Sequence, residues 1–416
     1  MKRSFLLYFL FTLIGILFLG RLFQLQVIRG KDYNPVKNSA VKVKFDLPER
    51  GYIYDRNGEL LVANQLSYDV TIVPNEVTPL DTIEFCSLLK ISKENFIKRF
   101  KKAENYAPWL ESVFLKQLAK EDFAFLQEKL HKFQGFNIQK RVIRNYPIKS
   151  AANILGYINE VNELVAKKDN YYQQGELIGK AGVEAQYEKV LRGKKGKKYF
   201  RRDRFNKIKG PFKNGIYDSI AVNGKDITLT IDSKLQQYGE YLMKGKRGGI
   251  IALEPSSGEI LALVTSPSYD PNMMVGRLRS PNSVKLIGDS INKPMYDRGL
   301  KGTYPPGSPF KLVNALIGLQ EDVIDENTHF FCNGGYRYGN RKKEFMKCHC
   351  DIYGKPIQLN SAISKSCNSY FANTYKRIIE KNKNSTNGMN NWSTHVKSFG
   401  LGNYLGYDLP EGDKGL

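Results

Sequence analysis

The feature that most restricts the fold of this 416-residue chain is an uncharged apolar segment at its N-terminus. Residues 4–20, SFLLYFLFTLIGILFLG, contain no charged side chain, and Lys2 and Arg3 precede them. This length reaches the lower limit for a helix that spans a bilayer, and RLFQLQVI extends the helix toward the interface. The sequence therefore predicts a cytoplasmic tip and a transmembrane anchor over residues 1–28.

A cleaved signal peptide is the alternative interpretation of this segment. No small-x-small cleavage site follows the apolar stretch, because Arg21, Leu22 and Phe23 come next. This absence favours a retained anchor. With no second apolar span in the sequence, the positive-inside rule places the bulk of the chain outside the cytoplasm.

The formal net charge of +23 requires an explanation. An extracytoplasmic chain does not meet nucleic acid, so anionic lipid headgroups or wall polymer are the better partners. The stretch LRGKKGKKYFRRDRFNKIKG (191–210) holds ten basic residues and one acid, Asp203. We interpret it as a solvated strand pair with long cationic side chains rather than as a membrane or polymer contact.

The region after the anchor predicts strands mixed with helices. In ERGYIYDRNGELLVAN (49–64), apolar and polar residues alternate on both sides of Asn57-Gly58, which is typical of a tight hairpin. Residues 86–103 and 115–133 have the pattern of amphipathic helices, and residues 135–147 predict a strand that Pro147 ends.

A second domain is predicted to begin near residue 223. NGKDITLTIDSKLQQYGEYLM (223–243) predicts a strand and then a helix. RGGIIALEPSSGEILALVTSP (247–267) predicts an antiparallel hairpin, and helical patterns recur at 357–381. A hairpin-rich sheet with segregated helices indicates an α+β fold.

The segment GTYPPGSPFKLVNALIGL (302–319) contains the first candidate for chemistry. Ser308 and Lys311 lie one helical turn apart, so the amine can reach the hydroxyl. The alternative is that Ser308 caps a helix in which Pro309 takes the first position. Spacing alone does not decide, because Ser39-Ala40-Val41-Lys42 has the same Ser-x-x-Lys pattern.

A serine nucleophile needs a base, and histidine is the usual one. No histidine of this chain lies in a recognisable Ser-His-Asp order; the four are His131, His329, His349 and His395. A lysine can act as the base when burial or neighbouring positive charge depresses its pKa. Lys311 is a candidate, because the helix it begins becomes apolar at once.

A second element lies downstream in SKSCNSYF (364–371), which supplies Ser366, Cys367 and Asn368. A hydroxyl here could relay protons, and an amide could hold a substrate backbone. The bare Ser-x-Asn pattern also occurs at Ser280, Ser290 and Ser385. Position separates them, because only Ser366 follows the nucleophile helix and opens an aromatic-rich helical segment.

Ser-x-x-K followed by Ser-x-Asn is the signature of penicillin-binding proteins and serine β-lactamases. The chain further resembles the class B penicillin-binding proteins in RGYIYDRNGELLVAN, ILGYINEV, GGIIALEPSSGEILALVTSPSYDPN and GTYPPGSPFK. IGKAGVEAQYEKVLRG is closer to the elongation-type members than to the septal ones. The resemblance implies an elongated β-rich pedestal of the dimerisation type at 29–222 and a serine transpeptidase domain at 223–416.

The resemblance also implies an activity and the roles of its residues. The family cross-links peptidoglycan stem peptides as a D,D-transpeptidase. Ser308 would attack the bond between two terminal D-alanines, with Lys311 as the base and Ser366 as the proton relay. Asn368 would hydrogen-bond the substrate peptide. β-Lactams would acylate Ser308 as substrate mimics, and no metal would take part in catalysis.

One departure from the family pattern concerns its third motif. No Lys-Thr-Gly or Lys-Ser-Gly occurs after Asn368, and that strand lines the family's site and supplies an oxyanion N–H. We therefore expect a transpeptidase domain truncated at its C-terminus, a chain of residues 1–416 that does not itself acylate, and an in-frame Lys-Thr-Gly or Lys-Ser-Gly in the DNA downstream.

Four of the five cysteines fall close together: Cys332, Cys348, Cys350 and Cys367. A structural zinc site needs four such ligands, whereas an oxidising compartment favours disulfides. Cys-x-Cys is a poor disulfide pair and an unusual zinc spacing, so the residues alone leave both open. Some elongation-type relatives have zinc here, with the middle residue of Ser-x-Asn as one ligand, and this resemblance favours zinc on all four cysteines.

Resemblance suggests a SEDS-class membrane glycosyltransferase and rod-shape proteins as partners, bound through residues 30–220. Two alternatives stay open. One is a septal transpeptidase, which would differ in partners rather than chemistry. The other is a non-catalytic β-lactam sensor or scaffold, against which the long region before residue 223 argues.

Overall fold

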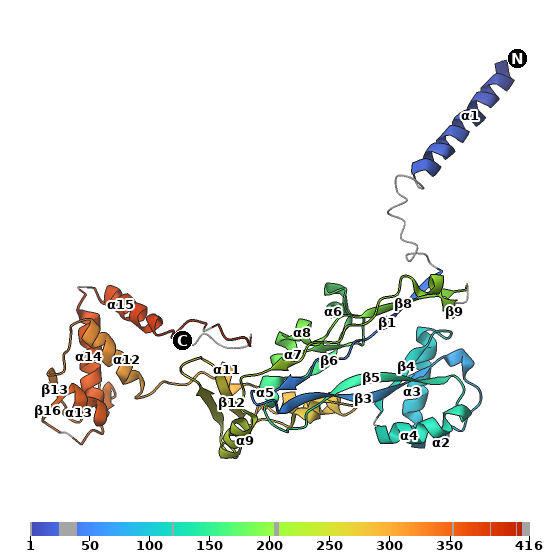
Figure 1. Ribbon diagram of the computed structural model, residues 1–416. Helices are drawn as coiled ribbons and strands as arrows, with labels where there is room; N and C mark the ends of the chain where they lie inside the picture. The colour runs from blue at the N-terminus through green and yellow to red at the C-terminus, as the bar shows by residue number, and fades with distance from the viewer. Residues whose placement is uncertain are drawn as a thin grey trace. The chain divides into compact units, whose positions relative to one another are not determined.

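The computed structural model describes residues 2–24, 40–118, 120–203, 208–351, 353–382, 384–404 and 406–409 (Figure 1). The chain forms two compact units. Unit 1 comprises Met1–Ile148, Val161–Ile178 and Tyr187–Leu229, and unit 2 comprises Lys149–Glu160, Gly179–Gln186 and Thr230–Leu416. Both units combine helices with mainly antiparallel strands, so the predicted α+β fold class is confirmed.

The N-terminal segment forms helix α1, Lys2–Phe23. Within the described ranges, no helix combines the length and the apolar character that crossing a membrane requires. Residues 25–28 of the predicted anchor lie outside the described residues, as does Ser39 of the second Ser-x-x-Lys pattern.

The predicted hairpin at Asn57-Gly58 is present in unit 1. Strands β2, Ile53–Tyr54, and β3, Leu60–Ile72, pair antiparallel on either side of the turn. Gly58 has a φ of 83°, which glycine adopts without steric cost. The carboxylate of Asp55 closes the turn by accepting hydrogen bonds from the backbone N–H groups of Asn57 and Glu59, both at 2.8 Å.

The long strand β3 is the centre of a five-stranded sheet. Its partners are β2, β4 (Ser112–Leu118) and β5 (Phe136–Asn145), and β10 (Ile227–Thr228) adds to β2 in parallel. Strand β5 confirms the prediction for residues 135–147. Because β10 belongs to this sheet, unit 1 extends to Leu229.

The boundaries predicted for the two helices between β3 and β5 are wrong. Instead of one helix at 86–103, α2 (Thr82–Leu89) ends at Lys90, which adopts a left-handed φ of 52°, and α3 (Lys93–Tyr106) begins after a Ser92 cap. The first part of the predicted helix at 115–133 is strand β4; α4, Lys120–Lys129, and a 3-10 turn, Leu130–Lys132, make up the helical part. Strand β4 pairs with β3, and this pairing overrides its local helical pattern.

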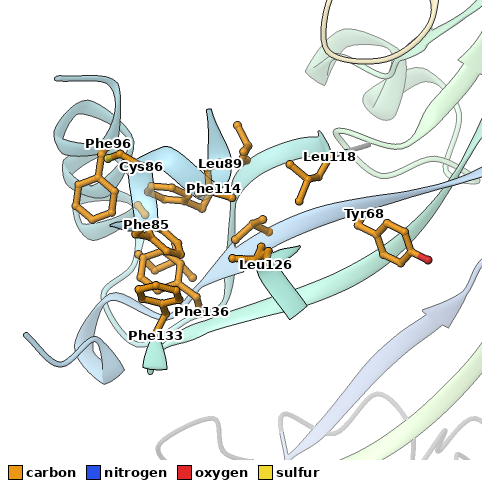
Figure 2. Close-up of a cluster of buried hydrophobic side chains, with 14 residues drawn as sticks. Tyr68, Phe85, Cys86, Leu89, Phe96, Phe114, Leu118, Leu126, Phe133 and Phe136 are labelled. Carbon is orange, nitrogen blue, oxygen red and sulfur yellow. The ribbon is translucent and has the colours of Figure 1, made fainter. Parts of the chain in front are cut away.

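Phenylalanine side chains form the core beneath these helices (Figure 2). Phe85 of α2 is fully buried and lies with its ring centroid 4.6 Å from that of Phe133 and 4.4 Å from that of Phe136. Phe96 of α3 and Phe114 of β4 complete the cluster. This aromatic core joins the α2–α4 helices to the end of the sheet.

A separate three-stranded sheet in unit 1 contains most of the basic stretch. Its strand order is β1 (Val41–Asp46), β8 (Gly196–Arg202) and β9 (Ile208–Pro211), all antiparallel. Most of its lysine and arginine side chains are exposed.

Unit 2 contains the hairpin predicted at 247–267, formed by β11 (Gly248–Leu253) and β12 (Ile260–Ser266). Helix α9, Ser233–Leu242, packs on β12 and is capped by Asp232.

Smaller elements of the two units include α5 Ala152–Leu155, β6 Ile158–Glu160, α6 Glu163–Lys168, β7 Leu177–Gly179, α7 Gly182–Gln186, α8 Glu188–Leu191, α10 Arg279–Gly288 and α11 Arg298–Lys301.

The C-terminal part of unit 2 is a group of helices with two short antiparallel strand pairs. Helix α14 (Asn368–Glu380) packs against both α12 (Phe310–Gln320) and α15 (Ser385–Ser398). The helical pattern at 357–381 is interrupted, because α13 (Leu359–Ser364) ends before α14 begins. β14 (Gly335–Arg337) and β15 (Phe345–Lys347) form a hairpin, and β13 (His329–Phe331) and β16 (Pro356–Gln358), which flank it in the sequence, pair antiparallel with each other.

Candidate active site

Ser308 lies in an exposed turn that leads into α12. Gly307 adopts a φ of 65°, and the backbone N–H groups of Phe310 and Lys311 bond to the carbonyl oxygens of Gly307 and Ser308 at 3.2 and 3.0 Å. The helix itself begins at Phe310, with Pro309 at the cap position and no side-chain cap. The capping interpretation of Ser308 is therefore wrong, and its hydroxyl is available for another contact.

That contact is with Ser366, which lies in the break between α13 and α14. Ser366 adopts a left-handed φ of 51°, an uncommon conformation for a residue with a side chain. Its Oγ lies 2.9 Å from the Oγ of Ser308, at hydrogen-bond distance, and either hydroxyl can donate. Of the four Ser-x-Asn serines, only Ser366 contacts Ser308 within the described part of the chain.

Lys311 completes a chain of three polar groups. Its Nζ lies 3.0 Å from Ser366 Oγ, 2.8 Å from the Ser366 carbonyl oxygen and 2.5 Å from Asn368 Oδ1. Burial lowers the pKa of Lys311, against the opposing charge of nearby cysteine thiolates. A neutral Nζ can accept a proton from Ser366 while Ser366 accepts one from Ser308, so this arrangement can activate the Ser308 hydroxyl.

Asn368 bridges Lys311 to the hairpin inserted before α13. Its Oδ1 accepts from Lys311, and its Nδ2 donates to the carbonyl oxygen of Lys347 at 2.7 Å. Its backbone N–H points to the sulfur of Cys348 at 3.2 Å. Sequence reasoning missed the Lys347 carbonyl, because any residue type can supply a backbone acceptor.

A cavity of about 600 Å³ adjoins Lys311 and Asn368. Aromatic side chains of β14, α14 and the loop after β14 contribute to its wall, among them Tyr336, Tyr338, Phe371 and Tyr375. Sequence analysis did not assign these residues to the site, although the tyrosines of GGYRYGN were a visible signal for an aromatic wall.

No histidine takes part in this arrangement within the described residues. His395 Nε2 lies 2.6 Å from Glu321 Oε1, and His329 Nδ1 lies 3.2 Å from the carbonyl oxygen of Asn327. The base in reach of the Ser308–Ser366 pair is therefore Lys311.

The side chains of the four clustered cysteines come together next to the loop that carries Ser366 and Asn368. Their sulfur atoms all lie within 4.8 Å of one another, with Cys348 and Cys367 3.6 Å apart and Cys332 and Cys350 3.5 Å apart. All five cysteines of the chain are free thiols in the structure, and Cys86 lies apart from the cluster in the aromatic core of unit 1.

The thiols of the cluster differ in their ionisation. Burial raises the pKa values of Cys332 and Cys367. Burial opposes ionisation of Cys348 too, but the backbone N–H of Ser369 and the Cys350 thiol outweigh it and lower the pKa of Cys348 to about 6. The surroundings therefore favour ionisation of Cys348 and oppose that of Cys332 and Cys367.

Comparison with known proteins assigns the chain to a family. Residues 45–229 match the model of the penicillin-binding protein dimerisation domain, and residues 248–416 match the penicillin-binding protein transpeptidase domain. The chain belongs to the penicillin-binding proteins. Ser308, Lys311, Ser366 and Asn368 all lie within the second match.

Curated relatives of this penicillin-binding protein include the peptidoglycan D,D-transpeptidase MrdA of three bacteria. The chain is 33% identical to MrdA of Acinetobacter baumannii over 375 residues, covering 89% of the chain and 53% of that protein. The identity to MrdA of Haemophilus influenzae is 31%, covering 96% and 60%, and to that of Escherichia coli K12 it is 29%, covering 96% and 62%. The chain therefore spans about 53–62% of the length of these relatives.

Solved structures of similar fold come from Helicobacter pylori. A complex between penicillin-binding protein PBP2 and MreC matches with a TM-score of 0.72 and 26% identity, covering 90% of this chain and 69% of that one. PBP2 alone matches with a TM-score of 0.67 over the same shares. The fold of this penicillin-binding protein is therefore similar to that of PBP2.

Proposed function

We propose that this penicillin-binding protein is a serine D,D-transpeptidase that cross-links peptidoglycan stem peptides during cell elongation. The observation that carries the proposal is the chain of contacts from Lys311 Nζ through Ser366 Oγ to Ser308 Oγ, with distances of 3.0 and 2.9 Å. The names of the MrdA relatives support the substrate and the reaction.

The geometry suggests how the first half of the reaction proceeds. Neutral Lys311 accepts the proton of Ser366 as Ser366 takes that of Ser308, and the Ser308 oxygen attacks the carbonyl carbon between the two terminal D-alanines. The same relay returns the proton to the departing amine of D-alanine. An acyl-Ser308 ester remains, and β-lactams would form the same kind of ester by ring opening.

The second half of the reaction uses the relay again. The amine of a neighbouring stem peptide attacks the ester carbonyl and loses a proton to the relay of Ser366 and Lys311. The relay returns that proton to the Ser308 oxygen as the ester C–O bond breaks, which frees Ser308. Asn368 orients Lys311 through the 2.5 Å contact, and its amide is at the edge of the cavity that would receive the peptide. These roles need only side chains of the protein.

Fluorescent penicillin tests the proposal on the gene product in its own cells. We expect labelling of a gene product that carries the third motif expected above, Lys-Thr-Gly or Lys-Ser-Gly, loss of the label in Ser308→Ala, and normal labelling in Ser39→Ala, which removes the serine of the other Ser-x-x-Lys pattern. Label that persists in Ser308→Ala would refute Ser308 as the nucleophile.

We also propose that Cys332, Cys348, Cys350 and Cys367 hold a structural zinc ion. A tetrahedral zinc bound to four sulfurs at ~2.3 Å requires sulfur separations of about 3.8 Å, and the cluster's separations of 3.5–3.6 Å and its 4.8 Å limit fit this requirement. The backbone N–H groups of Asn368 and Tyr370 point to cluster sulfurs at 3.2 and 3.4 Å and would stabilise thiolates.

Bound zinc would cross-link the inserted hairpins to the Ser366 loop and so hold the Ser366 hydroxyl toward Ser308. Metal analysis of the purified protein tests this. We expect one zinc per chain that is lost in Cys332→Ser and retained in Cys86→Ser, whose sulfur lies outside the cluster. An unchanged zinc content in Cys332→Ser would remove the proposal.

We propose further that segment 4–20 anchors the protein in the inner membrane, with the remainder in the periplasm. The large apolar side chains of α1 support this, because Phe5, Phe11 and Phe18 are 68–76% exposed with no protein surface to cover them among the described residues. Resistance of the protein to extraction from membranes by alkaline carbonate tests the anchor, and release by that treatment would contradict it.

The partner proposal concerns residues 30–220. The structural neighbour from Helicobacter pylori is a complex with MreC, which supports a rod-shape protein as a partner of this chain. A SEDS-class glycosyltransferase is the second proposed partner. Crosslinking in cells followed by purification of the protein would test both, and recovery of septal proteins instead would refute the elongation role.

A further inference from the structure

The sheet β1-β8-β9, with the segment 212–222 that follows β9, forms a surface that we name the cationic ribbon. Segment 212–222 continues along β8, because Ser219 pairs with Lys197 and Val222 pairs with Lys194. Most side chains on both faces of the three strands are at least partly exposed. The ribbon is therefore not explained as one layer of a hydrophobic core.

The basic residues of this region divide into two groups. Those at the start of the basic stretch are structural: Arg192 Nη1 lies 3.1 Å from Asp169 Oδ2, and Lys195 Nζ lies 2.5 Å from Glu176 Oε2, with a side chain that is only 7% exposed. The second group is exposed and has no carboxylate partner within the described residues. The register places Lys42 and Lys44 on one face of the sheet and Lys197 and Arg201 on the other, because directly paired residues point to the same face and neighbouring residues alternate.

The register of the ribbon places like charges opposite each other. Lys44 of β1 is the direct partner of Lys198 of β8. Directly opposed like charges destabilise an antiparallel pair, and only Lys198 has a nearby carboxylate, Asp46 at 3.3 Å. This arrangement costs folding stability, and an anionic partner would relieve the repulsion.

Exposed apolar side chains lie on the same ribbon. Ile220 is 90% exposed, Ile216 is 80% exposed and Val222 is 57% exposed, while Ile208 begins β9. The register of segment 212–222 with β8 puts Ile220 and Val222 on the face that carries Lys42 and Lys44. Isolated apolar side chains are common at protein surfaces, but apolar side chains beside unpaired cations are typical of a surface that enters a bilayer interface.

In place of the solvated strand pair expected from the sequence, we infer that the cationic ribbon binds anionic phospholipid headgroups through the face that carries Lys42 and Lys44, with Ile220 entering the interface between headgroups and acyl chains. The inference rests on the proposed membrane attachment of segment 4–20. Strand β1 begins at Val41, and the 17 residues between Phe23 and Val41 can span at most about 60 Å, so the anchor keeps the ribbon within reach of the bilayer. Charge complementarity selects anionic lipid over neutral lipid.

The full chain in lipid nanodiscs provides the test. One preparation contains phosphatidylcholine alone and the other also contains phosphatidylglycerol, and hydrogen exchange is measured for the amides of 212–222. Each cation at an anionic bilayer strengthens association about fivefold, so two engaged cations slow exchange roughly 25-fold on the anionic discs. High salt removes the difference, because it screens charges over a few ångströms.

Two matched variants locate the effect. The ribbon variant replaces Lys42, Lys44, Lys197 and Arg201 by glutamine, and the control variant replaces four exposed lysines of α3 by glutamine: Lys93, Lys98, Lys101 and Lys102. Both remove the same formal charge. We expect the ribbon variant to lose the lipid-dependent protection and the control to keep it, with unchanged exchange in β3 and β5 as the check on folding.

Several outcomes would overturn the inference. Exchange of 212–222 that is the same on both discs refutes lipid binding, although incorporation into both discs would still support the anchor. Equal loss in the two variants shows a general charge effect rather than a ribbon site. If a soluble anionic polymer protects segment 212–222 and anionic discs do not, the ribbon binds a different partner. If the chain incorporates into neither kind of disc, both the anchor and the ribbon proposal are refuted.

Discussion

Replacing Asn368 by aspartate tests the role of the amide that contacts Lys311. The substitution keeps the shape of the side chain but places a negative charge where Asn368 Oδ1 now lies, 2.5 Å from Lys311 Nζ. It also removes the N–H donor to the Lys347 carbonyl. If Lys311 must be neutral to accept a proton, a carboxylate at this position opposes catalysis by stabilising its charged form.

The distance sets the scale of the effect. Two unit charges 4 Å apart attract by about 4 kcal/mol at an effective dielectric constant of 20, and these atoms are closer. Desolvation of the new carboxylate and its repulsion from the Lys347 carbonyl oxygen offset part of this attraction. We therefore expect the pKa of Lys311 to rise by about one to three units, the usual range for a close ion pair. The neutral fraction below that pKa falls by about 10- to 1000-fold.

Competitive acetylation followed by peptide mass spectrometry reports the pKa of each lysine and does not depend on turnover. In the unmodified protein, Lys311 should titrate below its usual pKa of 10.5 because of burial. Asn373→Asp is the matched control, because Asn373 lies on the same helix and bonds to the Ser369 carbonyl rather than to Lys311. A Lys311 pKa that is equal in the Asn368→Asp and Asn373→Asp variants would refute the reasoning.

Three further changes test the site and the fold. Ser366→Gly should leave the free energy of unfolding in urea unchanged or raise it by up to ~1 kcal/mol, since glycine tolerates a φ of 51°. Penicillin labelling of this variant should fall about 100-fold or more, and undiminished labelling would contradict the relay. Phe85→Ala should destabilise unit 1 by about 3–5 kcal/mol, measured by hydrogen exchange in β3 and β5, and a loss below ~1 kcal/mol would exclude the aromatic core as described. Hydrogen bonds from Asn391 and His395 lower the pKa of Glu321 from 4.5 to about 2, so its stabilisation is present above pH 4.5 and is lost as the pH falls toward 2. Glu321→Gln should therefore cost roughly 1–2 kcal/mol at pH 7 in urea unfolding and almost nothing near pH 2, and equal costs at both would contradict the linkage.

The sequence predicted those elements whose conformation depends on their own residues and turns. The Asn57-Gly58 hairpin follows from a turn that needs positive φ, and the β11–β12 hairpin from two apolar runs around a turn. The break between α2 and α3 was also readable, because Asp81 and Ser92 are capping residues that accept hydrogen bonds at the starts of these helices. Strand β4 was not readable from its own residues, since its conformation depends on pairing with β3.

The same distinction applies to the site. Ser308, Lys311 and Ser366 were predicted from short motifs, and the structure brings their side chains together although 55 residues separate Lys311 from Ser366. The aromatic wall and the Lys347 carbonyl were missed, because their placement depends on how the inserted hairpins fold back on α14. The cysteine cluster was visible in the sequence, but only the fold shows that its sulfurs lie next to the Ser366 loop.

The exposed turn that presents Ser308 makes this residue dispensable for the architecture around it. Its side chain caps no helix and fills no part of a core, and its Oγ contacts that of Ser366. Under the function proposed above, an alanine in its place should leave a folded protein that binds a donor peptide and cannot cleave it. Such a trapped complex would allow the uncut ligand to be seen by crystallography.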